Sequence, residues 1–466
     1  MTSAELKLKT SETLDPGFQP ASLFFQHYDE QASQNPESTR TILALARPDG
    51  TCFHHSMRLL PDGGEFSELN ERYIERTLKF LLWMQGGSRI HFCGPRRLAD
   101  YLRATYSATG ARVFDFGFIG QKIFREDLTV EHHDSAATLP PALDKTTTLG
   151  GHLQGCRIGF DLGGSDRKTA AVIDGKVVFS EEVPWDPYFQ SDPNYHLEGI
   201  RQSLQSAAEH LPHVDAIGGS AAGVYINNEV RAASLFRGVT DADVFEGQVR
   251  NIFKDLAKEW NDVPFDVIND GEVTALAAAL SLKTHSILGI AMGTSLAAGY
   301  CDPNGRITSW LNELAFCPVD MRPDAPADEW SGDVGCGVQC FSQQAVARLA
   351  PAAGFDFGNM PFPEQLVEVQ MALLEGHTGA ARIFETIGNY LGHCLPLYAR
   401  FYPLKHVLLL GRVTSGDGGE ILLETAREVL HAYYPELAES IKLHTPDETN
   451  KRHGQAIAAA SLPALV

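Results

Sequence analysis

The sequence has no run of basic residues and no long apolar stretch, and both absences narrow the possible functions. Its 466 residues carry 38 lysines and arginines against 59 aspartates and glutamates, a formal net charge of −21. An acidic chain of this kind is poorly suited to wrapping nucleic acid or lying on an anionic membrane. No apolar stretch approaches the length that spans a bilayer. We therefore expect no nucleic-acid partner and no membrane association.

Targeting and disulfide signals are also scarce. Residues Met1–Lys7 lack the apolar core of a signal peptide. The eight cysteines are mostly scattered, as in proteins of a reducing compartment. These features predict a soluble, cytoplasmic protein, and its length favours two or three domains.

Residues 1–150 have the pattern of a small α/β domain. The expected elements are, in order, a hairpin at 41–54, a helix at 67–84, a strand at 89–93, a helix from 95 to 106 and a strand at 111–116. The polar, threonine-rich segment 144–151 is the predicted linker to the rest of the chain.

A glycine turn, Asp161-Leu162-Gly163-Gly164-Ser165, follows an apolar strand at 157–161. Adjacent glycines let the backbone come close to a ligand, and consecutive N–H groups in such a turn form an anion-binding nest. A carboxylate at the start of the turn can hold Mg²⁺, directly or through water. The turn therefore suits the phosphate end of a nucleotide, although an ordinary hairpin can have the same composition.

The second half of the chain repeats this arrangement. A hairpin at 286–300 contains Met292-Gly293-Thr294-Ser295, and a later strand at 406–410 runs into Gly411. Between the two hairpins, a strand ends at Asn269-Asp270 and an alanine-rich helix follows. Two hairpin-and-helix halves, each with a phosphate-type turn, indicate a duplicated α/β domain with a ligand cleft between the halves.

The order of these motifs resembles the hexokinase–actin superfamily and, within it, the ROK family of bacterial sugar kinases, over residues 155–466. The resemblance implies duplicated actin-like, ribonuclease-H-like α/β lobes with an interdomain cleft, the first lobe at 155–280 and the second at 281–466. Residues 1–150 would then be an extra N-terminal α/β domain. The implied activity is ATP-dependent phosphoryl transfer to a hydroxyl of a hexose or related sugar, with Mg²⁺ bound alongside ATP.

The resemblance also implies roles for individual residues. Asp270 would be the catalytic base that accepts the proton of the attacking hydroxyl, and Asp161 would help to hold Mg²⁺. The expected sugar-binding residues are Gly223, Asn269, Asp270 and Glu313. The expected ATP-binding residues are Asp161, Gly163, Gly164, Ser165, Gly293, Thr294, Ser295 and Gly411. Plain structural alternatives stay open: Asn269 or Asp270 as a helix N-cap, Glu313 as a surface carboxylate and Gly223 as a loop glycine.

Two departures from the family pattern affect the sugar site. The family's sugar-binding histidine is expected three residues after the glutamate, where this chain has Phe316. The family's structural zinc site needs closely spaced cysteines and a histidine. Cys317, Cys336 and Cys340 offer three sulfur ligands without a C-x-x-C pair or an obvious fourth ligand, so we expect no structural zinc.

Alternatives to a sugar kinase remain at this point. The chain could be a non-catalytic sugar- or nucleotide-binding protein of the same fold. It could also be a sugar-responsive regulator, although residues 1–150 show no basic recognition helix. Those residues could instead be a degenerate copy of an actin-like half, or an unrelated fold that packs on the kinase core or mediates homodimer contacts.

Overall fold

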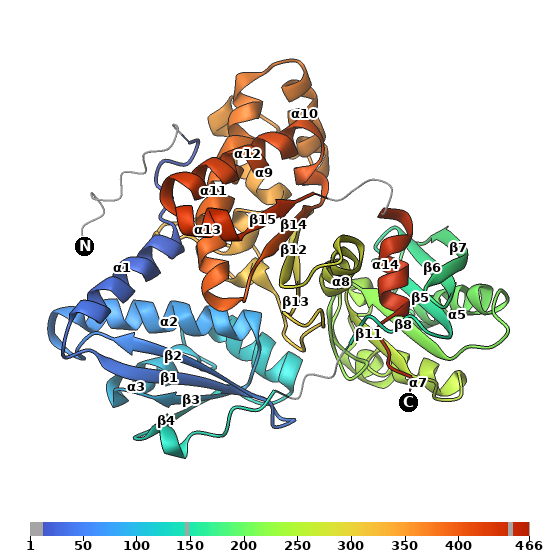
Figure 1. Ribbon diagram of the computed structural model, residues 1–466, viewed down its shortest axis with the longest axis horizontal. Coiled ribbons are helices and arrows are strands. Elements are labelled where there is room, and N and C mark those ends of the chain that lie inside the picture. The colour runs from blue at the N-terminus through green and yellow to red at the C-terminus, as the bar shows by residue number, and fades with distance from the viewer. Residues whose placement is uncertain (1–12, 145–148, 446–450, 466) are drawn as a thin grey trace.

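The computed structural model describes residues 13–144, 149–445 and 451–465 and contains three sheet-based bodies (Figure 1). In Figure 1 the N-terminal sheet lies at lower left, the first lobe at right and the helix-rich second lobe at the top. The middle of the predicted linker, residues 145–148, lies outside the described residues. Among the described helices, none combines the length and apolar character that crossing a membrane requires.

The first lobe is built on a five-stranded sheet of order β11-β8-β5-β6-β7. Its strands are β5 (Cys156–Leu162), β6 (Asp166–Ile173), β7 (Lys176–Pro184), β8 (Ala216–Ala221) and β11 (Phe265–Asn269). β5 pairs antiparallel with β6 and parallel with β8, and β8 pairs parallel with β11. Every residue of β5 is buried, as expected for a strand covered on both faces. The lobe also contains helices α5 (Pro193–Ala208), α6 (Ala242–Val244), α7 (Ile252–Glu259) and α8 (Asp270–Leu282). A separate two-stranded sheet is formed by β9 (Val224–Ile226) and β10 (Glu229–Ala232).

The second lobe repeats the strand directions of the first. Its sheet has the order β13-β12-β14-β15, from β12 (Ile287–Met292), β13 (Leu296–Cys301), β14 (His406–Leu410) and β15 (Lys442–His444). β12 is antiparallel to β13 and parallel to β14, as β5 is to β6 and β8. Its helices are α9 (Gln343–Leu349), α10 (Phe362–Leu374), α11 (Thr378–Phe401), α12 (Gly416–Tyr433) and α13 (Pro435–Ser440).

The last helix, α14 (Lys451–Ala460), returns to the first lobe. Helix α14 packs on β5, β6 and β8. In Figure 1 it is the red helix beside the green first lobe. Two strand glycines make this possible: a Cβ at Gly159 would lie 1.9 Å from the Ala456 carbonyl oxygen, and one at Gly218 would lie 1.7 Å from that of Ala459. The C-terminal helix therefore packs with residues that are distant in sequence.

The N-terminal body is a four-stranded sheet of order β2-β1-β3-β4 with its helices on one face. Its elements are α1 (Ala21–Gln34), β1 (Thr39–Ala46), β2 (Cys52–Leu59), α2 (Ser67–Met84), β3 (Arg89–Cys93), α3 (Arg96–Thr105) and β4 (Thr129–His133). The strand predicted at 111–116 is wrong: these residues enter a short helix, α4 (Val113–Asp115), which continues as a π-helix to Phe124. Aromatic residues there pack on α2 instead of extending the sheet.

Strand direction separates the N-terminal sheet from the two lobes. β1 pairs antiparallel with β3, whereas the corresponding central strands of the lobes pair in parallel. This difference argues against a degenerate copy of a lobe. The N-terminal sheet also shares one continuous hydrophobic core with the second lobe, in which Phe80 stacks on Phe401 with ring centroids 4.2 Å apart.

Buried charges join the same two bodies. The ammonium of Lys79 on α2 lies 3.1 Å from Asp115 and 2.9 Å from Asp333, which belongs to the second lobe. All three side chains are almost completely buried, so the ammonium and the two carboxylates each need the opposite charge to offset their desolvation. Helix α2 is thereby anchored against the second lobe.

Candidate active site

The carboxyl ends of three parallel strands meet at one edge of the first-lobe sheet. In the register, Leu162 of β5 lies beside Ala221 of β8, and Ala221 lies beside Asn269 of β11. Ligands of open α/β sheets bind beyond this edge of the strands. The register therefore brings together Asp161, Gly223, Asn269 and Asp270, four of the residues predicted from sequence.

Asp161 is a buried carboxylate with few protein partners. The Ser220 hydroxyl donates to its Oδ1 at 2.7 Å. Burial raises the pKa of Asp161, and the Ser220 hydrogen bond and the charge of Lys168 offset only part of that effect. A carboxylate that is desolvated and incompletely compensated suits a divalent cation.

The side chains of Asn269 and Asp270 make different hydrogen bonds. The Asn269 side chain caps α8, because its Oδ1 accepts from the Gly271 N–H at 2.7 Å, and its Nδ2 donates to the Gly223 carbonyl at 2.8 Å. The Asp270 carboxylate also accepts from Gly271, at 3.0 Å, and is only partly buried. Burial, and secondarily the negative charge of Asp161, raises the pKa of Asp270 to about 6. The N-cap is thus supplied by Asn269, while Asp270 has the basicity of a general base near neutral pH.

Glu313 lies close enough to Asp270 for their charges to interact. Burial raises the pKa of Glu313 to about 7, with a further contribution from the charge of Asp270. The side chain is half-buried rather than exposed on a loop surface. The alternative of a solvated surface carboxylate therefore does not describe Glu313.

Two neighbours of these carboxylates were missed in the sequence, Glu272 and Asn312. Asn312 Nδ2 donates to Glu272 Oε1 at 2.8 Å, and the Tyr402 hydroxyl donates to Asn312 Oδ1 at 2.9 Å. Burial raises the pKa of Glu272 to about 8, although the Asn312 hydrogen bond acts in the opposite direction. The available signal was a glutamate inside an apolar, alanine-rich helix, since such a charge is rarely buried without a partner.

The first glycine turn does not depend on a left-handed backbone. Neither Gly163 nor Gly164 has a positive φ. Gly164 packs closely against Tyr188, because a Cβ there would lie 2.1 Å from the hydroxyl oxygen of that side chain. The Gly163 N–H closes the turn by donating to the Asp166 carbonyl at 2.9 Å. Within the described part of the chain, the N–H groups of Gly164 and Ser165 have no protein acceptor.

The second glycine turn connects β12 to β13. Gly293 donates its N–H to the Ser295 carbonyl at 2.9 Å, and Thr294 and Ser295 are exposed. Gly411, at the end of β14, has φ of 101°, and a Cβ there would lie 2.4 Å from the Met292 carbonyl oxygen. These contacts gather the predicted ATP-binding residues of the second lobe, Gly293, Thr294, Ser295 and Gly411, at the ends of β12 and β14.

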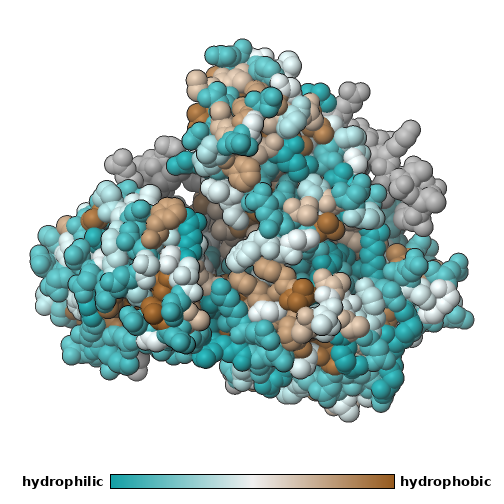
Figure 2. Space-filling model, turned by 180° about the vertical axis from the view of Figure 1, so that it is seen from behind, coloured by the Kyte–Doolittle hydropathy of each residue, from teal (hydrophilic) through white to brown (hydrophobic). Residues whose placement is uncertain are grey.

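Helix α8 joins the first lobe to the second. A Cβ at Gly271 would lie 2.4 Å from the Ala298 carbonyl oxygen on β13, and one at Gly299 would lie 2.1 Å from the Gly271 carbonyl oxygen. Only glycine permits this contact between the start of α8 and β13. From behind, the surface is visibly hollowed between the first lobe and the helix-rich second lobe (Figure 2).

Phe316 packs into an aromatic cluster formed mainly by the N-terminal body. Its ring stacks on Trp83 of α2 with centroids 4.2 Å apart, and Phe114 and Trp330 lie within 6 Å. A histidine at this position would have to place a polar ring among these aromatic side chains. Phenylalanine at position 316 therefore fits the aromatic side chains that the N-terminal body supplies.

The three cysteines considered as zinc ligands, Cys317, Cys336 and Cys340, are buried among other partners. Cys317 Sγ lies 3.8 Å from the Phe80 carbonyl oxygen, and Cys336 Sγ lies 3.7 Å from that of Asp333. Burial raises the pKa of Cys340 and disfavours its thiolate form. The absence of a structural zinc stays a prediction.

No protein-family model and no curated protein matches the sequence, but solved structures match the fold. A ROK hexokinase from Thermus thermophilus aligns with a TM-score of 0.52 and 21% identity, covering 66% of this chain and 96% of that one. A ROK transcriptional regulator, described as a homologue of the E. coli MLC protein, gives 0.50 and 18%, covering 66% and 78%. A candidate N-acetylmannosamine kinase from Listeria monocytogenes gives 0.50 and 15%, covering 66% and 97%.

These matches confirm the fold predicted from the motifs. The chain has the duplicated actin-like α/β fold of ROK proteins. Because a kinase and a transcriptional regulator both share it, the fold alone does not decide between catalysis and regulation.

Proposed function

We propose that the protein transfers a phosphoryl group from ATP to a hydroxyl of a hexose or a related sugar-like alcohol. The observation that carries the proposal is the mutual influence of three carboxylates, Asp161, Asp270 and Glu313, near the carboxyl ends of the first-lobe strands. Asp270, with a pKa of about 6, would accept the proton of the attacking hydroxyl. General bases work best when their pKa lies near the operating pH.

The nucleotide would bind through Asp161 and the two glycine turns. Bound Mg²⁺ would neutralise charge on the phosphate oxygens, and Asp161 is the carboxylate best suited to hold it. The N–H groups of Gly164, Ser165, Thr294 and Ser295 are the donors available to phosphate oxygens. Gly411, packed against Met292, would place the end of β14 beside the second turn.

The sugar would bind between Asn269, Gly223 and Glu313. A carboxylate can accept hydrogen bonds from two hydroxyl groups, which suits Glu313 to orient a polyol. The ring of Phe316 packs on Trp83, so this position would not supply the polar contact to a sugar hydroxyl that a histidine offers. Glu313 would then have to orient the acceptor with one polar partner fewer.

Phe316 also supports a second candidate, a non-catalytic sugar- or nucleotide-binding protein. With one polar sugar contact replaced, binding could persist without turnover. A regulator that contacts DNA is less well supported, because residues 13–144 form an α/β sheet that shares its core with the second lobe. Cytoplasmic location and a homodimeric state remain predictions.

The decisive experiment measures ATP consumption by the purified protein against a panel of hexoses, amino sugars and polyols. Asp270→Asn should lower turnover by about 10²–10⁴-fold, the usual contribution of a general base, and should leave ATP binding intact. Asp266→Asn, on the same strand β11, is the matched control and should remain active. ATP binding by the wild type without turnover on any acceptor would favour the non-catalytic candidate. Turnover of Asp270→Asn within a few-fold of wild type would reduce Asp270 to a structural residue.

A further inference from the structure

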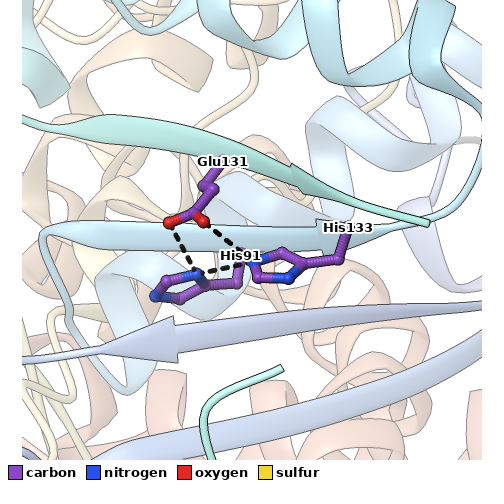
Figure 3. A group of neighbouring side chains, drawn as sticks. All are labelled: His91, Glu131 and His133. Carbon is purple, nitrogen blue, oxygen red and sulfur yellow. Dashed lines mark hydrogen bonds and ion pairs between the residues drawn. The ribbon is translucent and has the colours of Figure 1, made fainter. Parts of the chain in front are cut away.

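Two histidines and a glutamate converge on the face of the N-terminal sheet opposite its α-helices (Figure 3). His91 lies on β3, and Glu131 and His133 lie on β4, with His91 and Glu131 directly paired in the parallel register. The ligand atoms of all three lie within 4.8 Å of one another. Alternation along each strand places these side chains opposite Ile90, Phe92 and Val130, which belong to the hydrophobic core.

The distances between these atoms match those between ligands of one metal ion. His91 Nδ1 lies 3.0 Å from His133 Nε2 and 3.4 Å from Glu131 Oε2, and His133 Nε2 lies 3.6 Å from Glu131 Oε1. Ligands about 2.0–2.1 Å from a tetrahedral Zn²⁺ lie roughly 3.3–3.4 Å from one another. The two distances to Glu131 involve different oxygens, so its carboxylate would either bind the ion through both oxygens or turn to offer one of them to it.

Hydrogen bonds set the tautomer of His133 that a metal requires. The Thr138 hydroxyl donates to the Ser135 carbonyl at 2.8 Å, so its oxygen is left to accept a hydrogen bond from His133 Nδ1–H at 3.0 Å. Nε2 of His133 then carries the lone pair and accepts a hydrogen bond from His91 Nδ1–H at 3.0 Å, whose proton would move to His91 Nε2 when the ion binds. The other nitrogen of His133, Nδ1, is held by Thr138. Metal-bound histidines commonly have their second nitrogen held in this way.

Burial and exposure also fit a metal site open on one side. The side chains of His91 and His133 are 10% and 9% exposed, whereas that of Glu131 is 65% exposed. Glu131 would thus close a site that the ion enters from solvent.

We propose that His91, Glu131 and His133 bind a divalent transition-metal ion of the Zn²⁺ type, with a water molecule in the remaining position. Imidazole and carboxylate ligands in this combination suit Zn²⁺ and related first-row ions. The ion would link β3 to β4 and, through Thr138, to the segment that follows β4. The proposal is independent of the kinase function and concerns residues outside the candidate active site.

A second group of possible metal ligands lies in the first lobe and can be compared with the group on β3 and β4. Cys156, His213 and Asp215 also bring three ligand types together, but Asp215 Oδ2 already accepts from the Cys156 backbone N–H at 2.7 Å and His213 is 63% exposed. A metal there would have a sulfur ligand, whereas the group on β3 and β4 has none. The two sites can therefore be distinguished spectroscopically.

The test is titration of the full-length, chelator-treated protein, free of a polyhistidine tag, with Co²⁺ and then with Zn²⁺ as competitor. We expect one Co²⁺ per chain, with visible ligand-field bands, no sulfur-to-cobalt charge-transfer band, and displacement by Zn²⁺. Glu131→Gln and His133→Gln should abolish or severely weaken binding. Thr138→Val should weaken it by about 10–100-fold, as expected when a supporting hydrogen bond is lost. His213→Gln is the matched control and should bind normally.

Glu131 is exposed, so Glu131→Gln keeps the test valid even if a histidine variant does not fold. Circular dichroism of each variant would establish its folded state. The proposal is overturned if the wild type binds neither ion, or if Glu131→Gln and a folded His133→Gln both bind as wild type. A charge-transfer band lost in His213→Gln would move the metal to the Cys156 group.

Discussion

The backbone N–H of Glu313 donates a hydrogen bond to the carbonyl oxygen of Trp83, with an N···O distance of 3.0 Å. The N–H of Asn312 donates in the same way to Met84, at 2.9 Å. Trp83 and Met84 end helix α2, whose last carbonyl groups have no partner within the helix. The N-terminal body therefore holds the loop that presents the proposed sugar-binding carboxylate.

We predict that Glu313→Gln raises the KM for the sugar about tenfold or more and changes the KM for ATP much less. A charge-assisted hydrogen bond is worth roughly 1.5–3 kcal/mol, and an amide offers one acceptor where the carboxylate offers two. Steady-state kinetics with each substrate varied would measure both constants. Glu329→Gln, an exposed change nearby in the chain, is the control. Unchanged sugar kinetics would remove Glu313 from the site.

Asn312→Ala should destabilise the protein and weaken sugar use together. Asn312 has φ of 51°, and its side chain bridges Glu272 and Tyr402 inside the protein. Leaving such buried groups unpaired costs about 1–3 kcal/mol each, and the freed loop would misplace Glu313. Denaturant unfolding and the sugar KM are the two measurements.

The control for Asn312→Ala is Asn304→Ala, at an exposed turn, which should change stability by less than about 0.5 kcal/mol. A loss of stability in Asn312→Ala with a normal sugar KM would separate the loop's structural role from sugar binding.

Gly164→Val should impair ATP binding more than sugar binding. The new side chain would collide with Tyr188, whose hydroxyl oxygen lies 2.1 Å from the position of a Cβ, and would displace the first turn. Isothermal titration with an ATP analogue and with the sugar acceptor would compare the two affinities. Gly247→Ala, where nothing lies within 4 Å of an added Cβ, should leave both unchanged. Equal loss of both ligands in a folded Gly164→Val protein would contradict a specific role in nucleotide binding.

Glu272 should make the protein less stable as pH rises. Its pKa is about 8 in the folded state, above that of an unfolded glutamate, so the folded protein binds the extra proton between these two values. Its contribution is therefore complete below the unfolded pKa and is lost as pH rises toward 8, with a slope of up to about 1.4 kcal/mol per pH unit.

Glu272→Gln should remove this part of the pH dependence, because glutamine stays neutral and can still accept from Asn312. Unfolding free energies of both proteins across the range would give the difference directly. Parallel curves for the two proteins would mean that Glu272 is ionised in the fold.

Sequence patterns specified the features that depend on neighbouring residues. The hairpin at 41–54, helix α2 and the glycine turns were predicted because alternation, helical periodicity and turn residues act over a few positions. The Asn269-Asp270 pair was found at a strand end followed by a helix, and the structure confirms that local context. The error at 111–116 arose because an aromatic apolar run can be a strand or a buried helix, and only its packing on α2 decides.

Tertiary structure alone decided which distant residues meet. The hydrogen bond from Glu313 to Trp83, the return of α14 onto β5 and the pairing of His91 with Glu131 each join segments far apart in the chain. No local pattern encodes these contacts, because they depend on strand order, strand direction and the fit of whole surfaces. Local sequence patterns thus indicated a duplicated fold and named candidate site residues. Packing between bodies decided how the N-terminal sheet holds the loop of Glu313, since burial and register are properties of the assembled fold.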